Sequence, residues 1–374
     1  MLDKVKDKVQ KEAVKAIIKA GGRGIIVQAT GVGKSKVPIL YVKKLKYTKI
    51  ALIVPTEELR DNNWSKEFNL WKAGNIYTNV TRLCYASASK IKGEEYDIVI
   101  LDEAHHLTPL SYVFFLNNKV KDIIALTATL PSDEIKKNLL KSLGLNPVYT
   151  TTLDEAQELD LVAPFKIVVL YTKIDSTTRY IKAGNKAKPF LITEKAQYDY
   201  LTRVLNQIKE AGNIDMDKYK MLLLRRMRLI YNFKSKTSAA KLVLSTLDAK
   251  DRTLVFCGSI EQANILCEHK YHSKTNRKDL EAFMEGKIDR LSCVNALNEG
   301  MNISNLDKAV IVQLNSKELN LIQRVGRIIR KRAGHEALIY ILCCKDTQDE
   351  VWLQESLKNF NKENIEYKEL IVKI

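Results

Sequence analysis

The segment Ala29-Thr-Gly-Val-Gly-Lys-Ser35 indicates the fold of this 374-residue chain. It follows the apolar run Gly24-Ile-Ile-Val-Gln28, which suits a buried strand, and it opens a stretch with helical spacing, Ser35 to Lys46. A glycine-rich turn between strand and helix is the context of a phosphate-binding loop, because its backbone N–H groups can turn inward around phosphate oxygens. In such a loop, Lys34 would reach the β and γ oxygens and the Ser35 hydroxyl could ligate Mg²⁺.

A second pair of residues supports this interpretation, although the strict loop pattern would place glycine where Gln28 stands. Tyr96-Asp-Ile-Val-Ile-Leu-Asp-Glu-Ala-His105 puts two adjacent acids at the carboxyl end of a predicted strand. We expect Asp102 to hold the metal ion and Glu103 to orient and deprotonate the attacking water. The simpler alternatives are an ordinary glycine-rich turn and two acids that cap the next helix.

Short apolar runs alternate with helix-like segments in two series. The first 155 residues contain the runs 24–28, 50–54, 97–101 and 123–126; a later series contains 253–257, 289–294, 308–312 and 337–342. This β-α-β rhythm predicts two α/β domains in tandem, each with a parallel sheet flanked by helices. We place the first domain at residues 1–158 and the second at 159–374.

Residues 174–236 break this rhythm and are predicted to form a basic helical insert. They hold 14 Lys and Arg against 6 Asp and Glu, a large share of the chain's net charge of +17. Aromatic residues are interleaved with the charges, as a nucleic-acid surface would require. We predict nucleic-acid contacts from Arg225, Arg226 and Arg228; the alternative is a solvated insert whose aromatics pack on its own core.

Composition limits the class of protein. A hydrophobic content of 45% and a charged content of 28% are typical of a globular protein, and no run of 18 apolar residues is present. The first 20 residues resemble an amphipathic helix, with Val5, Val9, Val14, Ile17 and Ile18 on one side. The six cysteines lack zinc spacing, so we expect reduced thiols in an intracellular, cytoplasmic protein with no membrane partner.

A basic segment near the end of the chain, Gln323-Arg-Val-Gly-Arg-Ile-Ile-Arg330, aligns three arginines. They could neutralise phosphate charge from the side opposite the phosphate loop, and Gly326 would permit close approach. A basic surface stripe is the alternative, but it does not explain the Q-x-x-G-R-x-x-R spacing.

Taken in order, these segments resemble the motifs of superfamily 2 helicases. ATGVGKS, DEAHH, Thr127-Ala-Thr129 and QRVGRIIR resemble motifs I, II, III and VI. Pro55-Thr56 resembles motif Ia, Leu254-Val-Phe-Cys-Gly-Ser259 motif IV, and Leu297-Asn-Glu-Gly-Met-Asn302 motif V. Within the superfamily the chain looks closest to a DEAH-type branch that includes a phage branch-migration helicase, repair and transcription helicases and restriction-enzyme motor subunits.

The resemblance implies two RecA-like domains and a role for each matching residue. Lys34, Asp102, Glu103, Gln323, Arg327 and Arg330 would be catalytic, with the last two as arginine fingers. His105, Thr127, Ala128 and Thr129 would couple hydrolysis to movement, and Ser35 and Asp102 would hold Mg²⁺. Nucleic acid would contact Pro55, Thr56 and Gly258; ATP would contact Gln10, Thr30, Gly31, Val32, Gly33, Lys34, Ser35, Gly300 and Asn302.

Three motifs depart from the family pattern. Asn302 and Ser304 stand where this branch usually has Asp and often Pro, and Gln10 lacks the aromatic residue and arginine that usually precede it. Cys84-Tyr-Ala-Ser87 stands where a Thr-Tyr pair is expected.

These features predict an ATP-dependent helicase or translocase that uses Mg²⁺ and acts on duplex, forked or branched DNA. The resemblance implies 3′→5′ movement. An RNA helicase remains an alternative, as does an ATP-gated motor subunit with a protein partner in a replication, repair or restriction complex. A small-molecule kinase would not need the second arginine array.

Overall fold

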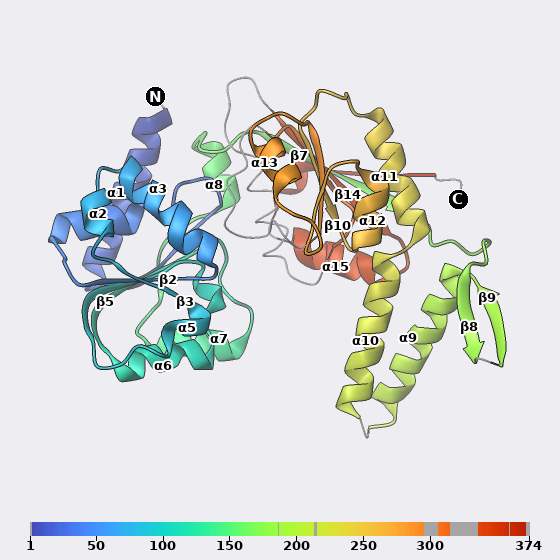
Figure 1. Ribbon diagram of the computed structural model, residues 1–374, viewed down its shortest axis with the longest axis horizontal. Helices are drawn as coiled ribbons and strands as arrows, with labels where there is room; N and C mark the ends of the chain where they lie inside the picture. The colour runs from blue at the N-terminus through green and yellow to red at the C-terminus, as the bar shows by residue number, and fades with distance from the viewer. Residues whose placement is uncertain are drawn as a thin grey trace. The chain divides into compact units, whose positions relative to one another are not determined.

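A computed structural model describes residues 2–185, 187–212, 215–294, 306–314, 336–358 and 360–371 (Figure 1). The described residues pack into two compact units. The first extends to Pro164, and the second contains the described residues from Phe165 onward.

The first unit is built on a six-stranded parallel sheet with the order β3-β2-β4-β5-β1-β6. In this order β1 lies between β5 and β6. Because the strands are parallel, the loop that follows β1 lies at the carboxyl edge of the sheet. The strands are β1 (Arg23–Gln28), β2 (Ile50–Val54), β3 (Thr81–Cys84), β4 (Glu95–Leu101), β5 (Lys119–Thr127) and β6 (Pro147–Thr151).

Helices cover both faces of this sheet, as alternating strand residues require (Figure 1). One face packs against α1 (Leu2–Lys19), α2 (Lys36–Leu45), α3 (Trp64–Leu70) and α4 (Gly74–Tyr77). The other packs against α5 (Tyr85–Ala88), α6 (Pro109–Asn117) and α7 (Glu134–Ser142). A π-helical turn, η1 (Leu59–Asn63), precedes α3; η2 (Ala104–His106) follows β4, and α8 (Leu153–Glu158) ends the unit.

The predicted amphipathic helix at the N-terminus is α1. Val9, Val14 and Ile17 are buried, whereas Ile18 is exposed because it lies at the edge of the apolar stripe.

The second unit contains a seven-stranded parallel sheet with the order β11-β12-β10-β13-β14-β7-β15. The strands are β7 (Phe165–Thr172), β10 (Thr253–Cys257), β11 (Lys270–Tyr271), β12 (Arg290–Val294), β13 (Lys308–Ile311), β14 (Ala337–Cys344) and β15 (Ile365–Glu369). Helices α11 (Lys234–Thr246) and α12 (Ile260–Leu266) pack on one face. The unit also contains α13 (Lys278–Met284), α15 (Gln348–Leu357) and η3 (Lys362–Asn364). Both units are therefore parallel sheets flanked by helices, as predicted.

A buried ion pair joins three elements of the second unit. Lys236 of α11 and Asp349 of α15 are fully buried, with 2.6 Å between the Lys236 Nζ and the Asp349 carboxylate. Asp349 also accepts a hydrogen bond from the Cys344 backbone N–H, and Lys236 donates to Gln313, which follows β13. Partners on three elements compensate much of the cost of burying these charges.

The basic insert differs from the prediction in one respect. Two helices occur as expected, α9 (Glu194–Glu210) and α10 (Met216–Tyr231), and they pack side by side (Figure 1). Before them, β8 (Ile181–Asn185) and β9 (Lys188–Ile192) form an antiparallel hairpin, so the insert is not wholly helical. Most of its β9 residues are exposed, and the hairpin therefore lacks the apolar alternation that would have marked it in the sequence.

The buried carboxylate of Glu194 ties the two ends of the insert together. It accepts hydrogen bonds from the Asp175 N–H at 3.2 Å on the entering side and from the Lys234 N–H at 2.6 Å on the leaving side. The Ser235 and Tyr180 hydroxyls donate to the same carboxylate. Because both of its oxygens accept hydrogen bonds, the buried Glu194 carboxylate is satisfied and holds both ends of the insert at one point.

Candidate active site

The glycine-rich loop after β1 has the backbone geometry that a phosphate cradle needs. Gly31 and Gly33 have φ values of 95° and 93°, in the left-handed region that favours glycine. The Gln10 side chain of α1 supports the loop from behind, donating from Nε2 to the carbonyls of Val32 at 3.2 Å and Gly33 at 3.3 Å. A Cβ on Gly33 would lie 2.8 Å from that nitrogen, so the loop and Gln10 are closely packed.

Lys34 of this loop forms an ion pair with Glu103, which follows β4. Both side chains are mostly buried, about 15% exposed. Glu103 has a φ of 49°, an uncommon conformation for a residue with a side chain and one that concentrates at functional sites. The fold therefore brings together the lysine and the acid that the sequence predicts as phosphate ligand and base.

Asp102 lies beside this pair with both carboxylate oxygens engaged. Its Oδ2 accepts a hydrogen bond from Trp64 Nε1 at 2.9 Å, and its Oδ1 accepts from the Glu103 backbone N–H at 3.0 Å. Tyr85 donates its hydroxyl proton to the Asp102 backbone carbonyl at 3.0 Å. These contacts fix the orientation of Asp102 within the first unit.

The two acids have shifted pKa values in opposite directions. Burial raises the pKa of Asp102 to about 6, although the nearby Lys34 charge opposes the shift. Burial also tends to raise the pKa of Glu103, but the charges of Lys34 and His105 and the hydrogen bond from Lys34 outweigh it, so the pKa of Glu103 is lowered.

The predicted coupling residues form a continuous contact chain. His105 Nδ1 lies 3.6 Å from the Glu103 carboxylate and 3.3 Å from the Thr127 hydroxyl oxygen. Thr127 donates its proton to the Thr129 carbonyl at 2.6 Å, so Nδ1 is the donor toward Thr127. Ala128, between the two threonines, is buried. A path of side chains therefore leads from Glu103 to the segment after β5.

The structure also shows contacts that the sequence did not predict. The Ser35 hydroxyl donates to Glu67 Oε2 at 2.9 Å, and Trp71 Nε1 donates to the same oxygen at 3.3 Å. Trp64, Glu67 and Trp71 are spaced by three and four residues, as on one helix face. This spacing was the only sequence signal, and the partners it faces become apparent only in the folded chain.

Five predicted site residues lie outside the described residues. They are Gly300, Asn302, Gln323, Arg327 and Arg330.

The residues predicted to contact nucleic acid occupy different environments. Pro55 and Thr56 follow β2 and are half-buried. Gly258 follows β10 and is closely packed, because a Cβ there would lie 3.0 Å from both Gln313 and Tyr231.

On α10 the three predicted arginines are not equivalent. Arg225 and Arg228 are exposed, whereas Arg226 is half-buried. Arg226 donates to Gln348 at 2.9 Å and lies over the Tyr198 ring. The exposed face of α10 also carries Lys218, Lys220, Met221 and Leu224.

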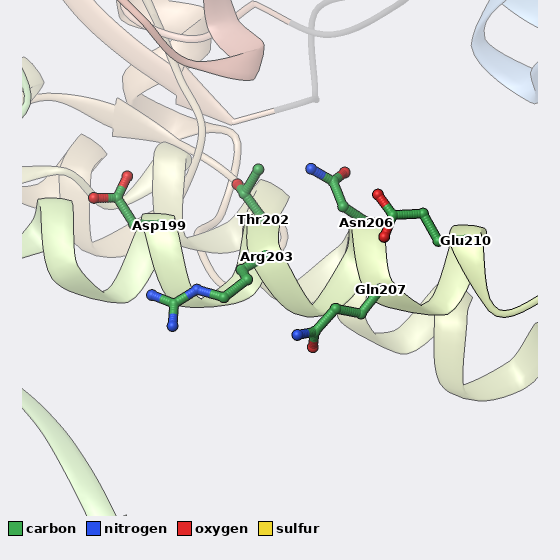
Figure 2. Close-up of a pocket in the computed structure, with 6 residues that line it drawn as sticks. All are labelled: Asp199, Thr202, Arg203, Asn206, Gln207 and Glu210. Carbon is green, nitrogen blue, oxygen red and sulfur yellow. The ribbon is translucent and has the colours of Figure 1, made fainter.

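The neighbouring helix presents a different surface. Figure 2 shows a hollow lined by one face of α9: Asp199, Thr202, Arg203, Asn206, Gln207 and Glu210. This face carries one cation and two acids, so it is not expected to bind an anion. The surplus of basic residues in the helix pair lies on α10.

Comparison with known families identifies the class of protein. Residues 4–82 match the family described as "Type III restriction enzyme, res subunit", and residues 234–332 match "Helicase conserved C-terminal domain". The two matches fall at the start of the first unit and in the second half of the chain. These matches, with the relatives described next, support an ATP-dependent helicase of superfamily 2, which is an ATP hydrolase.

Individual relatives resemble the chain over most of its length. The DNA 3'-5' translocase XPB2 of Sulfurisphaera tokodaii is 25% identical over 92% of this chain and 84% of its own. The type ISP restriction-modification enzyme LlaBIII bound to DNA superposes with a TM-score of 0.61 at 15% identity, over 98% of this chain and 31% of that enzyme. S. cerevisiae Dbp5 bound to RNA superposes with a TM-score of 0.57 at 15% identity, over 97% of this chain and 89% of its own. The two superpositions establish likeness of fold.

No helix within the described ranges is long and apolar enough to cross a membrane.

Proposed function

We propose that this protein is a DNA helicase or translocase that hydrolyses ATP with Mg²⁺ at the loop after β1 and moves 3′→5′ along its track. The observation that carries the proposal is the contact between Lys34 and Glu103, which places a phosphate-binding lysine against a candidate base. A phosphoryl-transfer site needs both groups at one point, because positioning and electrostatic stabilisation supply most of the catalysis.

The chain's own residues have separate roles in this proposal. Lys34 exchanges Glu103 for the β and γ phosphate oxygens of ATP, and the N–H groups of the loop bind the remaining oxygens. Glu103, once released, accepts a hydrogen bond from the attacking water and orients it toward the γ phosphorus. Arg327 and Arg330 would stabilise charge on the transferred group.

The residues present fit a magnesium ion. Ser35 and Asp102 offer a hydroxyl and a carboxylate, the hard oxygen ligands that Mg²⁺ prefers, and Asp102 is held in a fixed orientation by Trp64. When bound, the ion would neutralise phosphate charge. A divalent cation would also favour the ionised form of Asp102, opposing the effect of burial on its pKa.

The exposed face of α10 supports nucleic acid as the track. Its four exposed cations, Lys218, Lys220, Arg225 and Arg228, lie on the broad solvent-exposed side of the helix with Met221, Leu224 and one acid, Asp217. Such a surface suits phosphate contacts that position a strand without reading its sequence. The relative that matches 92% of this chain is named as a DNA translocase, which favours DNA.

The first test is steady-state ATP hydrolysis at moderate salt without polymer and with single-stranded, duplex and forked DNA and with RNA. Strong stimulation by DNA alone is the expected result. Equal or better stimulation by RNA would overturn the choice of DNA in favour of an RNA helicase. Turnover that needs Lys34 but responds to no polymer would instead indicate a motor subunit that acts with a protein partner.

A second test addresses the track. Arg225→Glu/Arg228→Glu should weaken DNA binding. It should also make the plot of log affinity against log salt concentration less steep by about 1.4–1.8, the value for two phosphate contacts. Arg203→Glu/Lys209→Glu on α9 is the matched control, because it changes the net charge equally on the neighbouring helix. Equal effects of the two double variants would show that α10 has no specific role.

A further inference from the structure

Helix α3 contacts both residues that we expect to hold the magnesium ion. Trp64 donates from Nε1 to Asp102 at 2.9 Å, and Glu67, one turn later, accepts from the Ser35 hydroxyl at 2.9 Å. Ser35 and Asp102 are 67 positions apart in the chain and belong to different loops. One face of one helix therefore joins two loops that must act together.

The contact with Trp64 determines how Asp102 presents its carboxylate. Trp64 is buried, and its ring lies 6.0 Å from that of Phe68, one turn further along the same helix. The indole is therefore held by packing on one side while its N–H points to Oδ2. The Glu103 N–H donates to Oδ1, so each carboxylate oxygen accepts one hydrogen bond. Each oxygen keeps a further lone pair for a cation, while the two hydrogen bonds prevent the carboxylate from rotating.

The contact with Glu67 determines how Ser35 presents its hydroxyl. Ser35 is the donor in this bond, since a carboxylate only accepts, so the oxygen lone pairs remain available as ligands. Trp71 holds Glu67 in place by donating to the same Oε2 at 3.3 Å. A hydroxyl whose proton is directed at a carboxylate is also more basic and hence a better ligand.

We propose that Trp64 and Glu67 are positioning residues that hold Asp102 and Ser35 ready for a divalent cation. Outer partners of this kind orient metal ligands and commonly change metal affinity by about 10–100-fold when removed. The proposal rests on the proposed function, since it assumes nucleotide and Mg²⁺ at this site.

The test measures metal binding without turnover. Mn²⁺ replaces Mg²⁺, and its binding to the protein with ADP is followed by the loss of the free Mn²⁺ electron paramagnetic resonance signal. Trp64→Phe keeps an aromatic ring but removes the N–H, and it should weaken Mn²⁺ binding about 10-fold. Affinity for ADP in EDTA should stay at the wild-type value, because the phosphate loop is unchanged.

Two comparisons separate positioning from loss of stability. Ile17→Val removes buried volume from the same apolar cluster but on another helix, α1, so it should lower stability and leave the Mn²⁺ midpoint unchanged. Glu67→Ala should weaken Mn²⁺ binding, and Glu67→Gln, which still accepts from Ser35, should restore most of it. Because Glu67 is half-buried, its variants test the proposal even if Trp64→Phe does not fold.

The outcomes are distinguishable. Wild-type Mn²⁺ midpoints in both Trp64→Phe and Glu67→Ala would overturn the positioning role and leave the proposed function intact. A shift of equal size in Ile17→Val would also overturn it. Failure of the wild-type protein to bind ADP would instead refute the proposed function.

Discussion

Replacement of Glu103 by Gln should tighten ATP binding while it abolishes turnover. In the structure the Glu103 carboxylate holds the Lys34 ammonium that the phosphates need, so ATP must first displace it. Gln can still accept one hydrogen bond from Lys34 but carries no charge. Loss of the competing charge should therefore release Lys34 for the nucleotide.

The size of the effect follows from the type of bond. Lys34 keeps its charge in the variant, so what is lost is the attraction between two unit charges, about 1 kcal/mol in water and about 4 kcal/mol near a protein surface. The pair is mostly buried, at 16% and 15% exposed, so water screens it little. A difference of about 1.4 kcal/mol corresponds to about tenfold tighter binding.

Isothermal titration of ATP in EDTA measures this change without metal or hydrolysis. Glu95→Gln is the matched control. Glu95 is the first residue of β4, the strand that Glu103 follows, and it pairs with Lys119 at an exposed position, so its variant should bind ATP as the wild type does. Unchanged or weaker ATP binding by Glu103→Gln would refute the competition between carboxylate and phosphate. Retained hydrolysis would refute the role of Glu103 as the base.

Three further predictions concern other parts of the structure. Lys34→Ala should abolish hydrolysis and weaken ATP binding in the same titration, and undiminished turnover would remove the loop from the mechanism. Gly33→Ala should destabilise the protein by more than Gly21→Ala. Both glycines have a left-handed φ, 93° and 73°, but a Cβ on Gly33 would lie 2.8 Å from Gln10, whereas a Cβ on Gly21 would meet no atom within 4 Å. Thermal unfolding of the two variants checks this difference. Lys236→Met should cost about 3–5 kcal/mol in urea unfolding because it leaves the Asp349 charge buried without its partner; a cost below about 1 kcal/mol would show that water enters the site.

The predicted apolar runs include every interior strand of the two sheets except β7, and they include none of the edge strands. Strands such as β2 are buried along their whole length and therefore appear as continuous apolar runs. The edge strands β6 and β15 carry proline, threonine and charged residues, and half or more of each is solvent-accessible. They lack the continuous apolar signal for that reason.

The candidate site shows the same division. Lys34, Asp102 and Glu103 could be placed because loops at the carboxyl edge of a parallel sheet converge whatever the details of packing. Trp64 and Glu67 could not, because their partners depend on how α3 lies against the sheet. The helix spacing indicated one face but not what that face would meet.

The junction at Glu194 has a consequence for how this chain could diversify. Asp175 and Lys234 are bridged by one side chain, so the main chain leaves the second sheet and returns to it at a single point. Segments of different length and composition could be exchanged there while β7 and α11 keep their positions. The second sheet could thus stay constant while the insert varies, and the Glu194 carboxylate lies at the boundary between them.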